Sequence, residues 1–254
     1  MAGGLACAVM EGCASHEAPQ ETTRPPMLEP FPGVRVDLAE KVVEFDGVVP
    51  IDPHDRETPL VFLEVVVCSR NTREHETLVV TEAAPSHVHA ALLMLGAEQG
   101  APGGWKRDEM LQRIVPSAPR GSAVRVEFEY RGKSGKLVRE NPSDWICDVR
   151  THRRLSGQVA GEPVWVFAGS AIAPRPDGPG EYYKGDIEGT LVGLATFGTE
   201  TLAWPKVFSP EAAVEAPEWI ADASRVPALG TRVTVRLRLG EPHEQTQGAS
   251  AGGA

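Results

Sequence analysis

The stretch AVRVEFEYR, residues 123–131, alternates strictly between apolar and charged side chains, and TRVTVRLRL at residues 231–239 follows the same rule. A period of two puts alternate side chains on opposite faces of an extended chain, so both stretches predict half-buried strands. If they are neighbours, Glu127 or Glu129 can pair across the sheet with the outward-facing arginines of the second stretch. Those arginines are Arg232, Arg236 and Arg238. We interpret the charged side as a solvated sheet face.

Apolar runs between turn residues predict further strands. The run LVFLEVVVC, residues 60–68, is nearly continuous apolar sequence and predicts a central strand covered on both faces. The segments 182–187 and 190–196 are expected to form a hairpin that turns at Glu188-Gly189. Shorter strands are expected at 34–37, 41–45, 77–81, 136–139, 145–149 and 164–168.

One helix is expected at about 85–95. Pro85 suits a first helical turn, and Gly96 suits the left-handed residue that commonly follows a helix end. Its apolar face, at the spacing i, i+3, i+4 and i+7, consists of Val88, Ala91, Leu92 and Leu95. We therefore expect an α+β, mainly β fold, with antiparallel or mixed sheets and this helix packed on the sheet.

Composition excludes several classes of protein. The 254 residues carry 25 basic and 35 acidic side chains, and a net charge of −10 argues against nucleic acid as a partner. A hydrophobic content of 41% is too high for wholesale disorder, and no apolar run approaches the roughly 18 residues of a membrane-spanning helix. The 22 prolines and 26 glycines favour many short elements joined by turns.

The amino-terminal residues predict a targeting signal. AGGLACAVM at residues 2–10 is small and apolar and leads to Cys13, which resembles the end of a bacterial lipoprotein signal. Cys13 is the expected lipidation site, with Cys7 as the alternate. Because no Lys or Arg precedes Arg24, either the true start lies upstream of Met1 or this is an ordinary flexible terminus.

Four segments follow from this division of the chain. They are a partial signal segment at 1–13, a proline-rich tether at 14–33, a single domain at 34–240 and a disordered tail at 241–254. The domain contains two cysteines, Cys68 and Cys147, which we expect to be separate thiols, with one disulfide as the alternative. Four cysteines without any C-x-x-C spacing argue against a zinc ribbon or an iron–sulfur cluster.

Several segments of the body resemble the YdjY-type domain. They are LEVVVC at 63–68, REHETL at 73–78, PSHVHAALL at 85–93 with Gly96, SDWI at 143–146, WVFAGS at 165–170, GTLVGL at 189–194 and GTRV at 230–233. The resemblance implies a domain of bacterial extracytoplasmic proteins, often lipoproteins or secreted proteins, without an established activity. Some proteins under this name are described as ferredoxin-like with cysteine-rich cluster-binding segments, which this chain lacks.

One group of residues has metal-binding chemistry. Glu64, His75, Glu76, His87 and His89 offer carboxylate and imidazole groups, which bind zinc-like ions or act as general acids and bases. Residues two apart on a helix, or adjacent on an extended chain, point in different directions, so at most one of each pair can join a site. The minimal trio is His75, His89 and Glu64, with Glu76 and His87 as alternates. The structural alternative is that His75 or Glu76 caps the start of the helix, while one histidine is a hydrogen-bonded residue at the edge of the core.

The leading hypothesis is a non-catalytic extracytoplasmic domain, either a membrane-anchored lipoprotein or periplasmic, with a binding or structural role at the bacterial cell envelope. Its expected partners are the membrane, through the lipid anchor, and an envelope protein or glycan. The alternative is a metal-binding or metal-dependent hydrolytic domain that uses His75, His89 and Glu64, and a divalent metal is the one cofactor considered. A role other than catalysis is favoured because no catalytic motif is assembled in the sequence.

Overall fold

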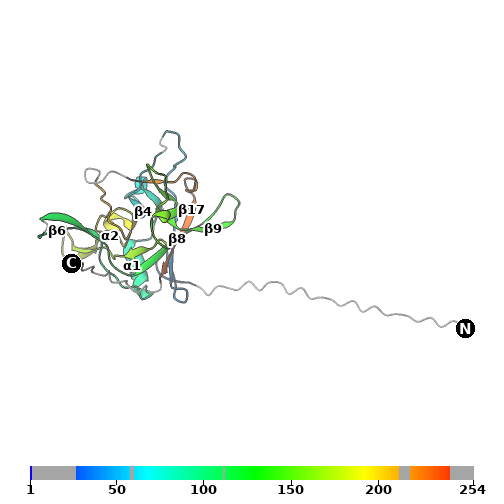
Figure 1. The fold of residues 1–254 in the computed structure, drawn as a ribbon. Helices are drawn as coiled ribbons and strands as arrows, with labels where there is room; N and C mark the ends of the chain where they lie inside the picture. Colours follow the sequence, from blue (N-terminus) through cyan, green and yellow to red (C-terminus); the bar gives the residue numbers. More distant parts are fainter. Residues whose placement is uncertain (2–26, 58–59, 111, 212–217, 241–254) are drawn as a thin grey trace.

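The structure, a computed structural model, is dominated by strands wrapped into a barrel (Figure 1). It describes Met1 and residues 27–57, 60–110, 112–211 and 218–240. The proposed lipidation sites Cys7 and Cys13, most of the tether and the tail lie outside the described residues. Within the described ranges, no helix has the length and apolar character needed to cross a membrane.

Eight strands of the described chain form a closed ring of hydrogen-bonded neighbours. In order around the ring they are β3 (Val42–Val48), β17 (Arg232–Leu239), β8 (Ala123–Arg131), β11 (Trp165–Phe167), β15 (Leu202–Ala203), β14 (Thr190–Gly193), β4 (Val65–Ser69) and β5 (Thr77–Thr81). The pairs β4–β5 and β14–β15 are parallel and the other neighbours antiparallel. The expected mixed, mainly β architecture is confirmed.

The ring closes where β5 meets the end of β3. Gly47 pairs with Thr81 and Val48 with Val80. A Cβ atom at Gly47 would lie 2.5 Å from a Val79 methyl carbon and 2.7 Å from the Val80 carbonyl oxygen. A residue without a side chain is therefore required where the two backbones approach.

Additional strands flank the ring. β1 (Leu28–Phe31) pairs with β2 (Val34–Asp37), which pairs with β3, while β9 (Leu137–Glu140) pairs with β8. The described residues also form three separate two-stranded sheets: β6 (Gly104–Asp108) with β7 (Arg113–Ser117), β10 (Ile146–Asp148) with β16 (Trp219–Ala221), and β12 (Ile172–Pro174) with β13 (Glu181–Tyr183). β1 falls in the segment for which we predicted an extended tether, so the paired part of the chain begins before residue 34.

Apolar side chains fill the inside of the barrel. The alternation of β8 and β17 puts one face of each strand into a single core that also holds several tryptophans. Its members include Val124, Val126, Phe128, Val233, Val235, Leu237, Trp145, Trp165 and Trp204, which are all buried. The prediction that the apolar face of each of these two strands is buried is confirmed.

The expected helix is α1 (Pro85–Met94), which packs against β1, β2 and β3. Its predicted apolar face is buried, including Leu95 just after the last turn. The remaining helical segments are short: η1 (Glu74–Glu76), η2 (Pro142–Asp144), η3 (Leu155–Gln158) and α2 (Lys184–Glu188). One well-defined helix on a strand-rich body was therefore a correct prediction.

Two local predictions are wrong. The expected hairpin at 182–196 does not form, because the chain turns into α2 after Tyr183 and ends that helix at Gly189, whose φ of 75° is left-handed. The apolar run 60–68 contributes only its second half to β4. Glu64 still bonds beside both neighbours of β4, to Glu76 before β5 and to Leu194 after β14, whereas the Leu63 N–H donates to Trp219 O of β16, outside the ring.

Candidate functional site

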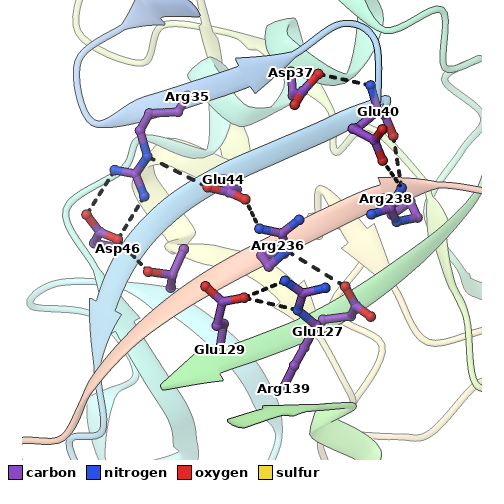
Figure 2. A network of polar contacts seen from close by, with 11 residues as sticks. Arg35, Asp37, Glu40, Glu44, Asp46, Glu127, Glu129, Arg139, Arg236 and Arg238 are labelled. Atoms are coloured by element: carbon purple, nitrogen blue, oxygen red, sulfur yellow. Dashed lines mark hydrogen bonds and ion pairs between the residues drawn. The ribbon is translucent and has the colours of Figure 1, made fainter. Parts of the chain in front are cut away.

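The outer faces of β2, β3, β17, β8 and β9 carry a ladder of opposite charges (Figure 2). One row stands in register across four strands and consists of Arg35, Glu44, Arg236 and Glu127. Arg236 forms an ion pair with Glu44, and its Nε lies 3.8 Å from the Glu127 carboxylate. Alternate charges across neighbouring strands therefore attract one another along the whole row.

The centre of this ladder is not solvated. The Arg236 side chain is 3% exposed and that of Glu44 is 7% exposed. Arg236 is flanked in register by Glu44 on one strand and Glu127 on the other, so long side chains of opposite charge surround it. The interpretation as a solvated face is thus wrong here, whereas the predicted pairing of β8 carboxylates with β17 arginines is confirmed.

A second row, nearer the end of the strands, consists of Asp46, Thr234 and Glu129 in register. Both terminal nitrogens of Arg35 donate to Asp46 at 2.9 Å, and the Thr234 hydroxyl donates to the same carboxylate. The Arg35 hydrogen bonds hold the pKa of Asp46 below its ordinary value. Arg139 pairs with Glu129 at 2.5 Å. Each carboxylate of this row is thereby bound to a guanidinium, and Arg35 also links the two rows because its Nε lies 4.0 Å from Glu44.

Beside the second row the surface is hollowed into an open groove of about 630 Å³. Its walls come from the ends of β3, β5 and β8 and from the start of β9 and β17. Apolar side chains, among them Val48, Val80 and Leu137, alternate with charged ones. The charged groups of the lining are Asp46, Glu82, Glu129, Arg70, Arg131 and Arg232. This groove combines polar and apolar contacts on one surface of the barrel.

The residues selected from the sequence for metal binding lie in two places. Glu64 and Glu76 line a small cavity of about 80 Å³. Arg73 Nη1 is 2.8 Å from Glu76 Oε1 and 3.8 Å from Glu64 Oε2, and the 81% exposed His75 side chain lies 3.7 Å from Glu76. Burial, followed by the neighbouring Glu76 charge, raises the pKa of Glu64. An arginine thus holds two carboxylates together here.

His89 belongs to a different cluster. Its Nδ1 lies 3.0 Å from the Tyr183 hydroxyl, which is 2.9 Å from the Thr201 hydroxyl, and burial lowers the pKa of the imidazole. His87 instead stacks on Phe31, with ring centroids 5.2 Å apart. The structure therefore brings Glu64, His75 and Glu76 together and separates them from both helix histidines. Across the described residues, no three His, Cys, Asp or Glu side chains are arranged to hold a metal ion.

Neither His75 nor Glu76 caps the start of α1. The Ser86 N–H in the first turn donates to the Asp186 carboxylate of α2 at 2.8 Å, a residue 100 positions later. Glu76 is instead bound to Arg73. The capping part of the structural alternative is wrong because a carboxylate from a distant segment satisfies this backbone donor. Its other part agrees with the half-buried His89, which hydrogen-bonds to Tyr183.

The two cysteines of the domain are separate, as expected. Cys68 and Cys147 are both free and buried. Burial raises the pKa of each thiol, which keeps both in the protonated and less nucleophilic form.

Sequence reasoning did not select the groove residues as a site. Arg131 and Arg232 were both placed on charged strand faces, but their approach depends on how β8 and β17 align. The repeated alternation of two neighbouring strands, each with an arginine at one end, was the available signal.

Comparison with known protein families gives one match. The YdjY domain family matches residues 34–238, a span that contains the ladder, the whole groove and every strand of the ring except the last residue of β17. No curated protein and no solved structure matches the chain significantly. The match covers most of the sequence and agrees with the similarity of the separate segments, so this chain belongs to the YdjY domain family.

Proposed function

We propose that this YdjY domain is a non-catalytic binding module of the bacterial cell envelope and that the groove is its binding surface. The observation that carries the proposal is the size and lining of the groove, about 630 Å³ with charged and apolar side chains side by side. Ligand sites in proteins have volumes of roughly 300–1,000 Å³ and combine apolar walls with a few fixed polar groups.

The groove walls are held in position before a ligand arrives. Asp46 is fixed by Arg35 and Thr234, and Glu129 by Arg139. The strands that carry these side chains belong to the ladder, which ties one strand to the next. A surface with fixed side chains loses little conformational entropy on binding, which favours specific recognition over loose contact.

Placement at the envelope is supported by the lipoprotein-type residues before Cys13 and by the proline-rich sequence that follows them. Cells that express the complete natural gene should carry the protein in the membrane or periplasmic fraction. Immunodetection after fractionation measures this, with a cytosolic enzyme and a known lipoprotein as markers. Full-length protein recovered in the cytosol would contradict the placement.

A photo-reactive amino acid introduced at Leu137 tests the groove as a binding surface. Leu137 lines the groove and is 60% exposed, whereas Ile187 on α2 is 68% exposed and is not part of the lining. Irradiated cells should yield a defined adduct from the Leu137 variant and none from the matched Ile187 variant. Mass spectrometry identifies the adduct. Equal yields at the two positions, or no adduct at either, would reject the groove as the site.

A further inference from the structure

We propose that the groove binds an anionic group, a phosphate or carboxylate on an apolar body, between the guanidinium groups of Arg131 and Arg232. This proposal rests on the proposed binding role of the groove and adds the chemical class of the ligand. It is carried by the charge pairing of the lining, the register of β8 and β17, and the apolar neighbours of the two arginines.

Two arginines of the groove, Arg131 and Arg232, form no ion pair with the described residues. Every carboxylate of the lining is already bound to a guanidinium, in the pairs Asp46 with Arg35, Glu129 with Arg139 and Glu82 with Arg70. The Arg131 side chain makes one hydrogen bond to the described residues, with the carbonyl oxygen of Gly135 at 3.1 Å. Arg232 has no hydrogen bond or ion pair with any described residue, although its charge helps to lower the pKa of Asp46. The surplus charge at this place is positive, while the whole chain is acidic.

Strand register puts the two surplus charges opposite each other. Val233 pairs with Tyr130, and the same antiparallel register continued by one residue sets Arg232 against Arg131. Like charges directly opposite across two strands destabilise a sheet. An anion between them converts the repulsion into two charge-assisted hydrogen-bonding contacts, and guanidinium groups match phosphate and carboxylate oxygens in geometry.

The same two strands carry a second pair of facing arginines, which can be compared with the pair in the groove. At their other end Arg238 pairs in register with Arg125, and there each arginine has a carboxylate of its own. Arg238 lies 3.4 Å from Glu40, and Arg125 is bound to Glu162. The chain therefore neutralises one arginine–arginine pair with its own carboxylates, whereas no carboxylate among the described residues is bound to the pair inside the groove.

Apolar side chains stand on both sides of the arginine pair. On β3, Val48 pairs with Arg232, and on β9, Leu137 pairs with Arg131. The row across the groove thus reads apolar, cationic, cationic, apolar, and all four residues line the groove. This order suits an anionic head with attached hydrocarbon better than a small hydrated ion, because the flanking side chains give no polar contact.

Binding of short-chain phosphatidylglycerol below its micellar concentration tests the site by calorimetry. The full domain should bind this probe, and the variant Arg131→Gln/Arg232→Gln should lose at least about tenfold in affinity, since two charge-assisted contacts disappear. The matched control, Arg125→Gln/Arg238→Gln, removes the same charge from the same strands and should keep its affinity within about twofold. Equal losses in both variants would show non-specific charge attraction and overturn the proposal.

Thermal melting without ligand provides a second readout that does not depend on the probe. Arg131→Gln/Arg232→Gln should lower the melting temperature less than the control, because it removes a repulsion together with the Arg131–Gly135 hydrogen bond, whereas the control breaks two ion pairs. A larger loss for the groove variant than for the control would overturn the proposal.

The source of the anion is resolved by two further titrations. Flotation with phosphatidylglycerol vesicles, compared with pure phosphatidylcholine vesicles, reports a membrane headgroup, and titration with hexyl phosphate reports a soluble anion. Arginine-dependent binding in either arm supports the site and assigns its source. If no anionic probe binds while the Leu137 cross-linker still gives its adduct, the anion proposal fails and the groove remains a binding surface.

Discussion

Replacement of Arg236 by leucine should lower the free energy of unfolding by roughly 3–5 kcal/mol, the cost of breaking a buried ion pair by removing one partner. The variant leaves Glu44 buried without the guanidinium that binds it and removes the cation 3.8 Å from Glu127. Urea denaturation, extrapolated linearly to water, measures the loss. An unchanged m-value would show that native stability has changed rather than the surface exposed on unfolding.

Two further variants separate burial from simple charge removal. Arg236→Leu/Glu44→Leu should regain most of the lost stability, because neither side of the pair is then left buried and charged. Arg70→Leu removes an arginine from the exposed pair with Glu82 and should hardly move the denaturation midpoint, since solvent screens such pairs. A loss at Arg236 no larger than that at Arg70 would mean that the ladder contributes no more than an ordinary surface pair.

Replacement of Glu200 by alanine should cost about 3 kcal/mol, because two backbone donors lose their acceptor. Glu200 is fully buried, and its Oε1 accepts hydrogen bonds from the N–H groups of Phe197 and Gly198. Glu200→Gln keeps a carbonyl oxygen for these donors and should be much less destabilising. Chemical denaturation of both variants provides the comparison, and equal losses would show that this acceptor is unimportant.

The raised pKa of Glu200 predicts that the stability of the protein depends on pH. Burial raises the pKa of Glu200 above its ordinary value of 4.5, so the folded protein binds this proton more tightly than the unfolded chain does. The resulting stabilisation is complete below the unfolded pKa and is lost as the pH rises through the raised folded pKa. Glu200→Gln does not titrate, so its stability should fall less over that interval. If the free energy of unfolding changes with pH by the same amount in the unmodified protein and in Glu200→Gln, Glu200 is not the source of the pH dependence.

Local patterns were sufficient where the controlling interactions are close in sequence. The alternation in β8 and β17 identified their inner faces, and the proline and glycine around α1 identified the helix. The burial of Arg236 could not be predicted this way, because it depends on β3, whose Glu44 is 192 residues away. The partner of His89 was equally remote, since Tyr183 lies 94 residues later in the chain.

Register was the missing information at the candidate site. The outward direction of Arg131 and Arg232 follows from alternation alone, but a shift of one residue between the strands would have placed them on opposite faces. The turn into α2 was missed for a related reason. The segment 182–187 has strand-forming tyrosines, and the left-handed Gly189 that ends α2 is equally compatible with the turn of a hairpin.

The position of β17 has a consequence for how the chain acquires its structure. This strand, the last among the described residues, inserts between β3, formed by residues 42–48, and β8, so the ring joins the two ends of the domain. A nascent chain that has not yet released residues 232–239 from the ribosome cannot complete the barrel. Closure of the ring must wait for the end of the domain, and the long stretch of sequence between β3 and β17 makes this step slow.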